Sequence, residues 1–220
     1  GAAGQEAALN VPDAVTLQAE YQSVIDRYHI TSIDFDIAVA AVVDLHSITL
    51  RDQAIVGLQA ANPALEVRFT LPVLPTGLDA NGLALLQHAK ADGVDIDVVN
   101  IMAMDYGPAV NNGGQMGLNA INAAKATALQ LQSLGLDAKI GITPMIGVND
   151  VAGEVFTLAD AQALLDYARS DPSIALLSMW SVARDNGNGA GSPWASPEYS
   201  GLAQQPFAFS GILKGFDVLA

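Results

Sequence analysis

Segments with the pattern of a strand and segments with the pattern of a helix alternate along the whole chain, and this rhythm limits the fold more than any other feature. Successive strand patterns start roughly 30 to 40 residues apart, which is the spacing of strands joined by helical crossovers. We therefore expect an α/β protein with a parallel sheet. The predicted strands are 32–38, 67–71, 98–104, 139–144 and 174–181, and the predicted helices are 13–28, 47–61, 81–91, 114–134, 158–169 and 206–216.

Two architectures share this rhythm, the open doubly wound sheet and the (β/α)8 TIM barrel. A dinucleotide-binding sheet would show G-x-G-x-x-G after a strand, and a P-loop would show G-x-x-x-x-G-K-[ST]. Neither motif follows any predicted strand, and the glycine-rich run 187–191 has neither the spacing nor a following helix, so we expect a flexible loop there. The sequence favours a TIM-barrel-type fold. It supplies five strand–helix units after a leading helix, so the barrel is expected to be incomplete.

Composition narrows the classes of function. The 220 residues are enough for one domain, which we expect to span 1–220. Lys and Arg number 9 against 23 Asp and Glu, a net charge of −14 that argues against nucleic acid or an anionic membrane surface as a partner. No cysteine is present, which excludes thiolate catalysis. His29, His46 and His88 fall in or beside predicted helices without metal-ligand spacing, so we expect surface or capping roles, no metal site and no cofactor.

The first predicted strand carries the residues with catalytic chemistry. Apolar Ile and Phe residues alternate in 32–38 with Asp34, Asp36 and Ala38. In a barrel the apolar face meets the helices, so the two carboxylates would point inward and rise toward the carboxyl end of the strand, where barrel active sites lie. The alternative is an edge strand whose polar face is exposed to solvent.

Residues 31–38, T-S-I-D-F-D-I-A, resemble the D-G-x-D-x-D-x-E signature on the fourth barrel strand of the glycoside hydrolase family 18 chitinases. The match is at Asp34 and Asp36. Further on, 69–72 is similar to the next strand of that family, N-I-M-A-M-D-Y at 100–106 to its Met/Tyr/Asp strand, and Trp180 to its last-strand Trp. The tail at 209–216 resembles the closing helix. The resemblance covers nearly the whole chain and is strongest to small, loop-poor bacterial chitinases.

This resemblance implies a secreted protein acting on β-1,4-linked N-acetylglucosamine by a substrate-assisted retaining mechanism. In the family, the 2-acetamido oxygen attacks its own anomeric carbon, a Glu protonates the leaving oxygen, and an Asp two residues earlier orients the acetamido group. Carried over to this chain, Asp36 is the orienting residue and Asp34 is the deeper carboxylate coupled to it.

The resemblance also implies contacts with the sugar. Tyr106 or Asp105 would hydrogen-bond the acetamido group, and Trp180 would form the apolar floor of the site. Met102 and Met104 are equally well explained as pocket lining or as core residues. Chitin or a chito-oligosaccharide is the implied partner.

One departure from the family pattern lies at the acid itself. Ala38 occupies the position of the catalytic Glu, and Val39 replaces the Gly that often follows it. Alanine has no proton to donate, and general acid–base catalysis contributes roughly 10²–10⁴-fold. We expect turnover to be impaired. An engineered substrate-trapping change and divergence, natural or engineered, both remain open as explanations.

The other departure is length. Residues 1–5 look like the end of the family's third strand, so the chain would be the C-terminal portion of the barrel, and the missing initiator Met indicates processing or a fragment. Exposed barrel edges could be covered by self-association. Three interpretations follow: a chitinase with impaired or absent catalysis, a non-catalytic lectin-like protein that keeps Asp36, Tyr106 and Trp180 for binding, and a fragment without a competent site.

Overall fold

The computed structural model describes residues 6–110 and 114–216, so the interpretation of residues 1–5 as a strand end lies outside the described part. The chain divides into two compact units. The first contains the described residues up to Pro72 together with Leu78–Val99 and Gln130–Ala138. The second contains Val73–Gly77, Asn100–Leu129 and the described residues from Lys139 onward.

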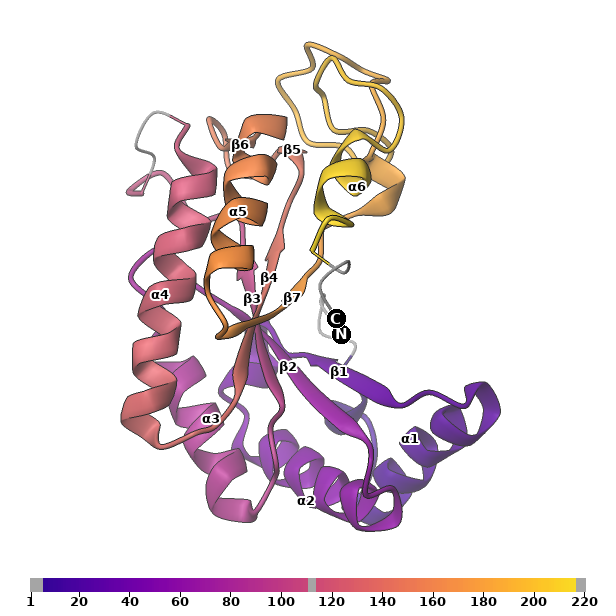
Figure 1. The fold of residues 1–220 in the computed structure, drawn as a ribbon. Helices are drawn as coiled ribbons and strands as arrows, with labels where there is room; N and C mark the ends of the chain where they lie inside the picture. Colours follow the sequence, from indigo (N-terminus) through magenta and orange to yellow (C-terminus); the bar gives the residue numbers. More distant parts are fainter. Residues whose placement is uncertain (1–5, 111–113, 217–220) are drawn as a thin grey trace. The chain divides into compact units, whose positions relative to one another are not determined.

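Strands and helices follow each other in the expected order (Figure 1). The strands of the main sheet are β1 (Ser32–Asp36), β2 (Glu66–Pro72), β3 (Val98–Ala103), β4 (Lys139–Pro144) and β7 (Ile174–Leu177). The α-helices are α1 (Ala14–Tyr28), α2 (Leu45–Ala61), α3 (Ala80–Asp92), α4 (Met116–Leu134), α5 (Leu158–Ser170) and α6 (Ala208–Leu213).

Sheet topology distinguishes the two candidate architectures. The strands are hydrogen-bonded in the order β1-β2-β3-β4-β7, which is also their order along the chain. A doubly wound sheet reverses its strand order at a switch point, whereas a barrel adds each new strand beside the previous one. The observed order confirms the TIM-barrel-type α/β fold, with five parallel strands in the described part.

In the first unit, β1 and β2 are parallel, and Asp34 lies opposite Arg68 while Phe35 lies opposite Phe69. The two phenylalanine rings meet edge to face at 5.9 Å, and Tyr21 of α1 packs on Phe35 at 5.3 Å. This aromatic contact buries the apolar face of β1 under α1.

In the second unit, β4 and β7 are parallel. A capping box begins α5: the Thr157 side chain accepts from the Asp160 amide, and the Asp160 carboxylate accepts from the Thr157 amide. The other oxygen of Asp160 accepts from the amide of Gly117 in α4 at 2.9 Å. One carboxylate therefore begins α5 and joins it to α4.

Some element boundaries differ from the sequence-based prediction. Helix α2 begins at Leu45 rather than 47, because Asp44 caps it by accepting from the amides of His46 and Ser47. Strand β7 ends at Leu177 rather than 181, and beyond it an isolated bridge joins Trp180 to Met145.

The second unit also contains a short hairpin that the sequence did not predict. It consists of β5 (Gly147–Val148) and β6 (Val155–Phe156), which pair antiparallel. The buried guanidinium of Arg184 donates to the carbonyl oxygens of Ile146, Val148 and Ser196. Arg184 thus fixes the hairpin and the following loop to each other.

Asp185, next in the chain, holds the other end of that loop. Its buried carboxylate accepts from the amides of Phe209 and Ser210 at the start of α6 and from the side chain of Gln204. The loop between Asp185 and the start of α6 contains the glycine-rich run 187–191. This run has turns and no helix or strand, as expected for a loop.

Among residues 6–110 and 114–216, no helix combines the length and the hydropathy that crossing a bilayer requires.

Candidate active site

The residues predicted to do chemistry fall into two groups. Asp34, Asp36 and Ala38 belong to the first unit, whereas the residues after β3 and after β7 belong to the second. Each group is built from the carboxyl end of a parallel strand, where the side chains of barrel active sites arise.

In the first group, the strict alternation of β1 separates the two acids from the core. Phe35 is buried on one side, while Asp34 is exposed and Asp36 half-buried on the other. The hydroxyl of Thr70, on β2, donates to Asp34 Oδ1 at 2.6 Å. The acids thus share one face, as the sequence predicted, and solvent reaches part of that face.

The surroundings of Asp34 disfavour its charge. Burial raises the pKa of the Asp34 carboxyl above 3.8, because the protein atoms around it displace part of its hydration even though the side chain keeps exposed surface. The hydrogen bond from Thr70 lowers the pKa, the charge of Asp36 raises it, and that of Arg68 lowers it. Asp34 therefore keeps a proton to higher pH than an ordinary aspartate.

Strand β1 ends at Asp36 rather than at the predicted residue 38, and Ala38 lies two residues beyond it, at the point where the chain leaves the sheet. The amide of Ile37 still donates to the carbonyl oxygen of Thr70 at 3.0 Å, so pairing with β2 continues up to this position. Ala38 has extended backbone and precedes the 3₁₀ helix Val39–Val42. A longer side chain here would start from a strand end held by hydrogen bonds, although alanine itself offers only a methyl group.

Val39 adopts a backbone conformation that a β-branched residue rarely takes. Its φ is 56°, in the left-handed region where glycine is favoured. In the family pattern, a Gly often occupies the corresponding position. The backbone at Val39 thus adopts a conformation typical of glycine.

The second group begins where β3 ends. Asp105, itself at a positive φ of 48°, accepts from the amide of Val151 at 3.1 Å. The buried carboxylate of Glu154 accepts from the amides of Tyr106 and Gly107 at 3.1 and 2.9 Å. The 145–156 segment thus fixes the backbone on which the two predicted sugar-binding residues stand.

Burial also governs the acid–base character of this group. It raises the pKa of Asp105 and that of Glu154, in each case against hydrogen bonds from backbone amides that lower it. Tyr106 is only 7% exposed, and its hydroxyl is buried without a hydrogen-bond partner among the described residues. Burial raises the pKa of this phenol, which stays protonated and able to donate. Met102 and Met104 are both half-buried.

Trp180 is presented to solvent by a fixed backbone. Its amide donates to the carbonyl oxygen of Pro144 at 2.8 Å, its carbonyl oxygen accepts from Ile146 at 3.0 Å, and its peptide bond to Ser181 is cis. The side chain is 55% exposed. Beside it lies a pocket lined by residues 177–182 with Ser210, Leu213 and Lys214. A large exposed apolar ring on such a support is suited to stacking against a flat ligand face.

Two features of the structure were missed by sequence reasoning. Glu154 lies on a segment without a strong pattern, and only its contacts reveal that it supports Tyr106. His88 was given a surface or capping role, yet it lies against Asp52 and Asp92 on α2 and α3, the only group of three or more potential metal ligands within the described residues. The His88–Asp92 spacing of four was the available signal.

Comparisons with known proteins give a consistent result. No family model matches the chain. It is 37% identical to a probable bifunctional chitinase/lysozyme of Escherichia coli K12 over 94% of this chain and 24% of that protein. It is also 37% identical to endochitinase 11 of Metarhizium anisopliae, over 80% of this chain and 36% of that protein. The chain therefore spans 24% and 36% of the lengths of these two curated relatives.

Among solved structures, it is similar to catalytic site mutants of active domain 2 of a chitinase from Pyrococcus furiosus. The TM-score is 0.82 and the identity 34%, with 94% of this chain and 67% of that chain covered. A structure of such mutants complexed with chito-oligosaccharides gives the same values.

Proposed function

Since the chain belongs to the glycoside hydrolase family 18 chitinases, we propose that it recognises chitin or chito-oligosaccharides through a chitinase-type site whose general acid is absent. The single observation that carries the proposal is the end of β1. There, two aspartates on one face lead to Ala38, at the position where the family has its proton donor.

The first group of residues would act on the sugar as follows. Asp36 orients the 2-acetamido group, and Asp34 modulates its charge. The raised pKa of Asp34 is consistent with this assignment: burial is its main cause, and the charge of the neighbouring Asp36 raises it further. With Ala38 in place of a Glu, no side chain at that position can protonate the leaving oxygen. We therefore expect slow hydrolysis and intact binding.

The second group would contribute binding. Asp105 keeps exposed surface and so can accept from the acetamido N–H, whereas the buried hydroxyl of Tyr106 is a donor in need of an acceptor. Trp180 would stack against the sugar, and Met102 and Met104 would line the sugar-binding surface formed by this second group. Chitin is uncharged, so a net charge of −14 does not oppose its binding. An insoluble extracellular polymer as substrate also favours a secreted protein.

Restoring the acid is the decisive experiment. Hydrolysis of chitotetraose would be compared among the unaltered chain, Ala38→Glu and the matched variant Ala38→Gln, which has the same length but no acidic proton. We expect Ala38→Glu to hydrolyse the substrate at least about 10²-fold faster than the other two. Calorimetric titration with chitotetraose would show binding by all three.

A non-catalytic, lectin-like role is the second candidate, and it is favoured by the combination of Ala38 with the exposed ring of Trp180. Binding by all three proteins without hydrolysis by Ala38→Glu would support it. If the unaltered chain hydrolysed chitotetraose as fast as Ala38→Glu, position 38 would not be the acid position, and the proposal would be wrong.

A further inference from the structure

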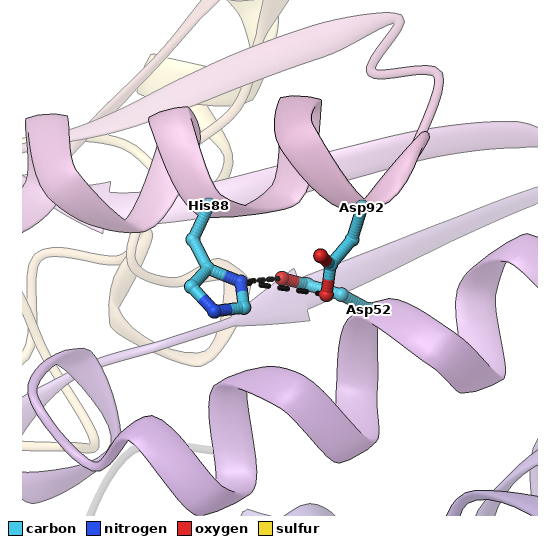
Figure 2. A group of neighbouring side chains, drawn as sticks. All are labelled: Asp52, His88 and Asp92. Atoms are coloured by element: carbon cyan, nitrogen blue, oxygen red, sulfur yellow. Dashed lines mark hydrogen bonds and ion pairs between the residues drawn. The ribbon is translucent and has the colours of Figure 1, made fainter.

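Two neighbouring helices of the first unit bring three potential metal ligands together (Figure 2). His88 and Asp92 are four residues apart on α3, and Asp52 faces them from α2. His88 Nδ1 lies 3.0 Å from Asp52 Oδ2 and 3.6 Å from Asp92 Oδ2. One ring nitrogen therefore faces a carboxylate oxygen of each helix.

Asp52 is the unusual member of this group. Its side chain is completely buried, and its second oxygen, Oδ1, has no hydrogen-bond partner among the described residues. The neighbouring Arg51 forms its ion pair with Glu6, at 3.4 Å. A buried carboxylate with an unsatisfied oxygen is costly unless a further positive charge compensates it.

The electrostatics agree with this geometry. Burial raises the pKa of Asp52 to about 6, even though the hydrogen bond with His88 and the charge of Arg51 both lower it. The buried Oδ1, without a hydrogen-bond partner in the described part of the chain, indicates that the side chains around Asp52 compensate its charge incompletely. With a neutral imidazole, the three ligands carry a charge of −2, which a divalent cation would neutralise.

We propose that Asp52, His88 and Asp92 bind a divalent transition-metal ion, with Zn²⁺ as the best match. An imidazole nitrogen and two carboxylate oxygens are ligands that Zn²⁺ accepts, whereas Mg²⁺ requires an octahedral shell of oxygen atoms. In a tetrahedral site with bonds of about 2.1 Å, ligand atoms are about 3.4 Å apart. The observed 3.0 and 3.6 Å lie on either side of this separation.

An ordinary His–Asp ion pair explains less of the structure. It accounts for the contact between His88 and Asp52 Oδ2, but it places the second carboxylate, that of Asp92, beside the first without a further cation. A bound ion uses all three side chains. His88 and Asp92 are 31% and 33% exposed, so an ion can enter from solvent, and water would complete its coordination. Such an ion would link α2 to α3, independently of the chitin site.

Thermal unfolding of the chelator-treated 220-residue chain tests the proposal. We expect ZnCl₂ at about 100 times its Kd to raise Tm by about 5–10 °C, since a ligand that binds only the folded state stabilises it. MgCl₂ at the same concentration should leave Tm unchanged. His88→Gln and Asp92→Asn should each abolish the rise in Tm on addition of Zn²⁺. His29→Gln and His46→Gln, which alter histidines outside the cluster, should keep it.

Co²⁺ gives a second readout, which does not depend on stability. Bound by one nitrogen and two carboxylates in a low-coordinate site, Co²⁺ should give a visible absorption band that Zn²⁺ displaces and that is lost in His88→Gln. The proposal is overturned if Zn²⁺ fails to raise the Tm of the unaltered chain. It is equally overturned if the response persists in both His88→Gln and Asp92→Asn, or if Mg²⁺ raises Tm as much as Zn²⁺.

Discussion

At the scale of single residues, the end of β1 has the backbone support of a catalytic position, whereas the side chain at position 38 is a methyl group. Asp34 and Asp36 share one face of β1, and the amide of Ile37 keeps the chain paired with β2 up to the residue before Ala38. Under the proposed function, Ala38 lacks the proton donor of the family, while the strand end that would support such a donor stays hydrogen-bonded. This is the physical reason for expecting one substitution to restore hydrolysis.

Val39 permits a prediction about stability. A φ of 56° costs a non-glycine residue about 1–2 kcal/mol, and glycine loses about 0.5–1 kcal/mol of backbone entropy in exchange. The side chain is 74% exposed, so little burial is lost on its removal. We expect Val39→Gly to raise the free energy of unfolding by about 0.5–1 kcal/mol, measured by urea denaturation.

Val43 provides the matched control. It is 56% exposed and lies in the same loop region, but its φ is −118°, where glycine brings no relief of strain. Val43→Gly should lower the free energy of unfolding by about 0.5–1 kcal/mol. Equal losses in the two variants would contradict the strain assigned to Val39.

At the scale of helices and strands, the sequence predicted most of the fold because each element is long enough to show its period. The strand at 139–144 and the end of α4 at Leu134 match the prediction. The hairpin of β5 and β6 was missed because two residues cannot show alternation. Strand β7 was predicted too long because its apolar residues continue past Leu177, where regular pairing with β4 ends.

For two helical glycines, we expect substitution by alanine to change the free energy of unfolding in opposite directions. A Cβ on Gly117 of α4 would lie 2.7 Å from Asp160 Oδ1 and 2.9 Å from Asp160 Cα, closer than packed atoms allow. We expect Gly117→Ala to lower the free energy of unfolding by about 1–3 kcal/mol, because α4 and α5 must separate. Chemical denaturation measures this change.

Gly82 of α3 is the comparison. A Cβ there would meet its nearest atoms, on Leu78 and Asp79, at 3.5 to 3.6 Å, which is ordinary contact. Gly82→Ala should raise the free energy of unfolding by about 0.5–1 kcal/mol, through the better helix propensity of alanine. If Gly117→Ala stabilised the protein as well, the close contact between α4 and Asp160 would not exist in solution.

At the scale of the whole molecule, the net negative charge affects the stability of the fold. With a net charge of −14, the carboxylates repel one another, and salt screens this repulsion. We expect Tm at pH 7 to rise by a few degrees when NaCl increases from about 0.05 to about 0.5 M, followed by circular dichroism. Near pH 4.2, the isoelectric point of the sequence, the rise should vanish. An equal rise at both pH values would assign the effect to burial of apolar surface instead.

The sequence was less informative about sites than about the fold. The shared face of Asp34 and Asp36 could be predicted because the two residues alternate on one strand. The cluster of Asp52 and His88 could not, because its members are 36 residues apart and meet only when α2 packs on α3. Which side of a helix faces which neighbour depends on packing, and periodicity alone does not specify it.

The paired anchors Arg184 and Asp185 have a consequence for how this protein can vary. They sit side by side in the chain, yet one holds backbone carbonyls of the hairpin and the loop, and the other holds the start of α6. The side chains of 190–195 carry none of this load, and Trp194 among them is 74% exposed. Within this stretch Gly191 has a φ of 87° and the Ser192 hydroxyl hydrogen-bonds the backbone of Trp194, so these two positions are constrained. The exposed side chain of Trp194 can be replaced while the anchors of the loop stay in place.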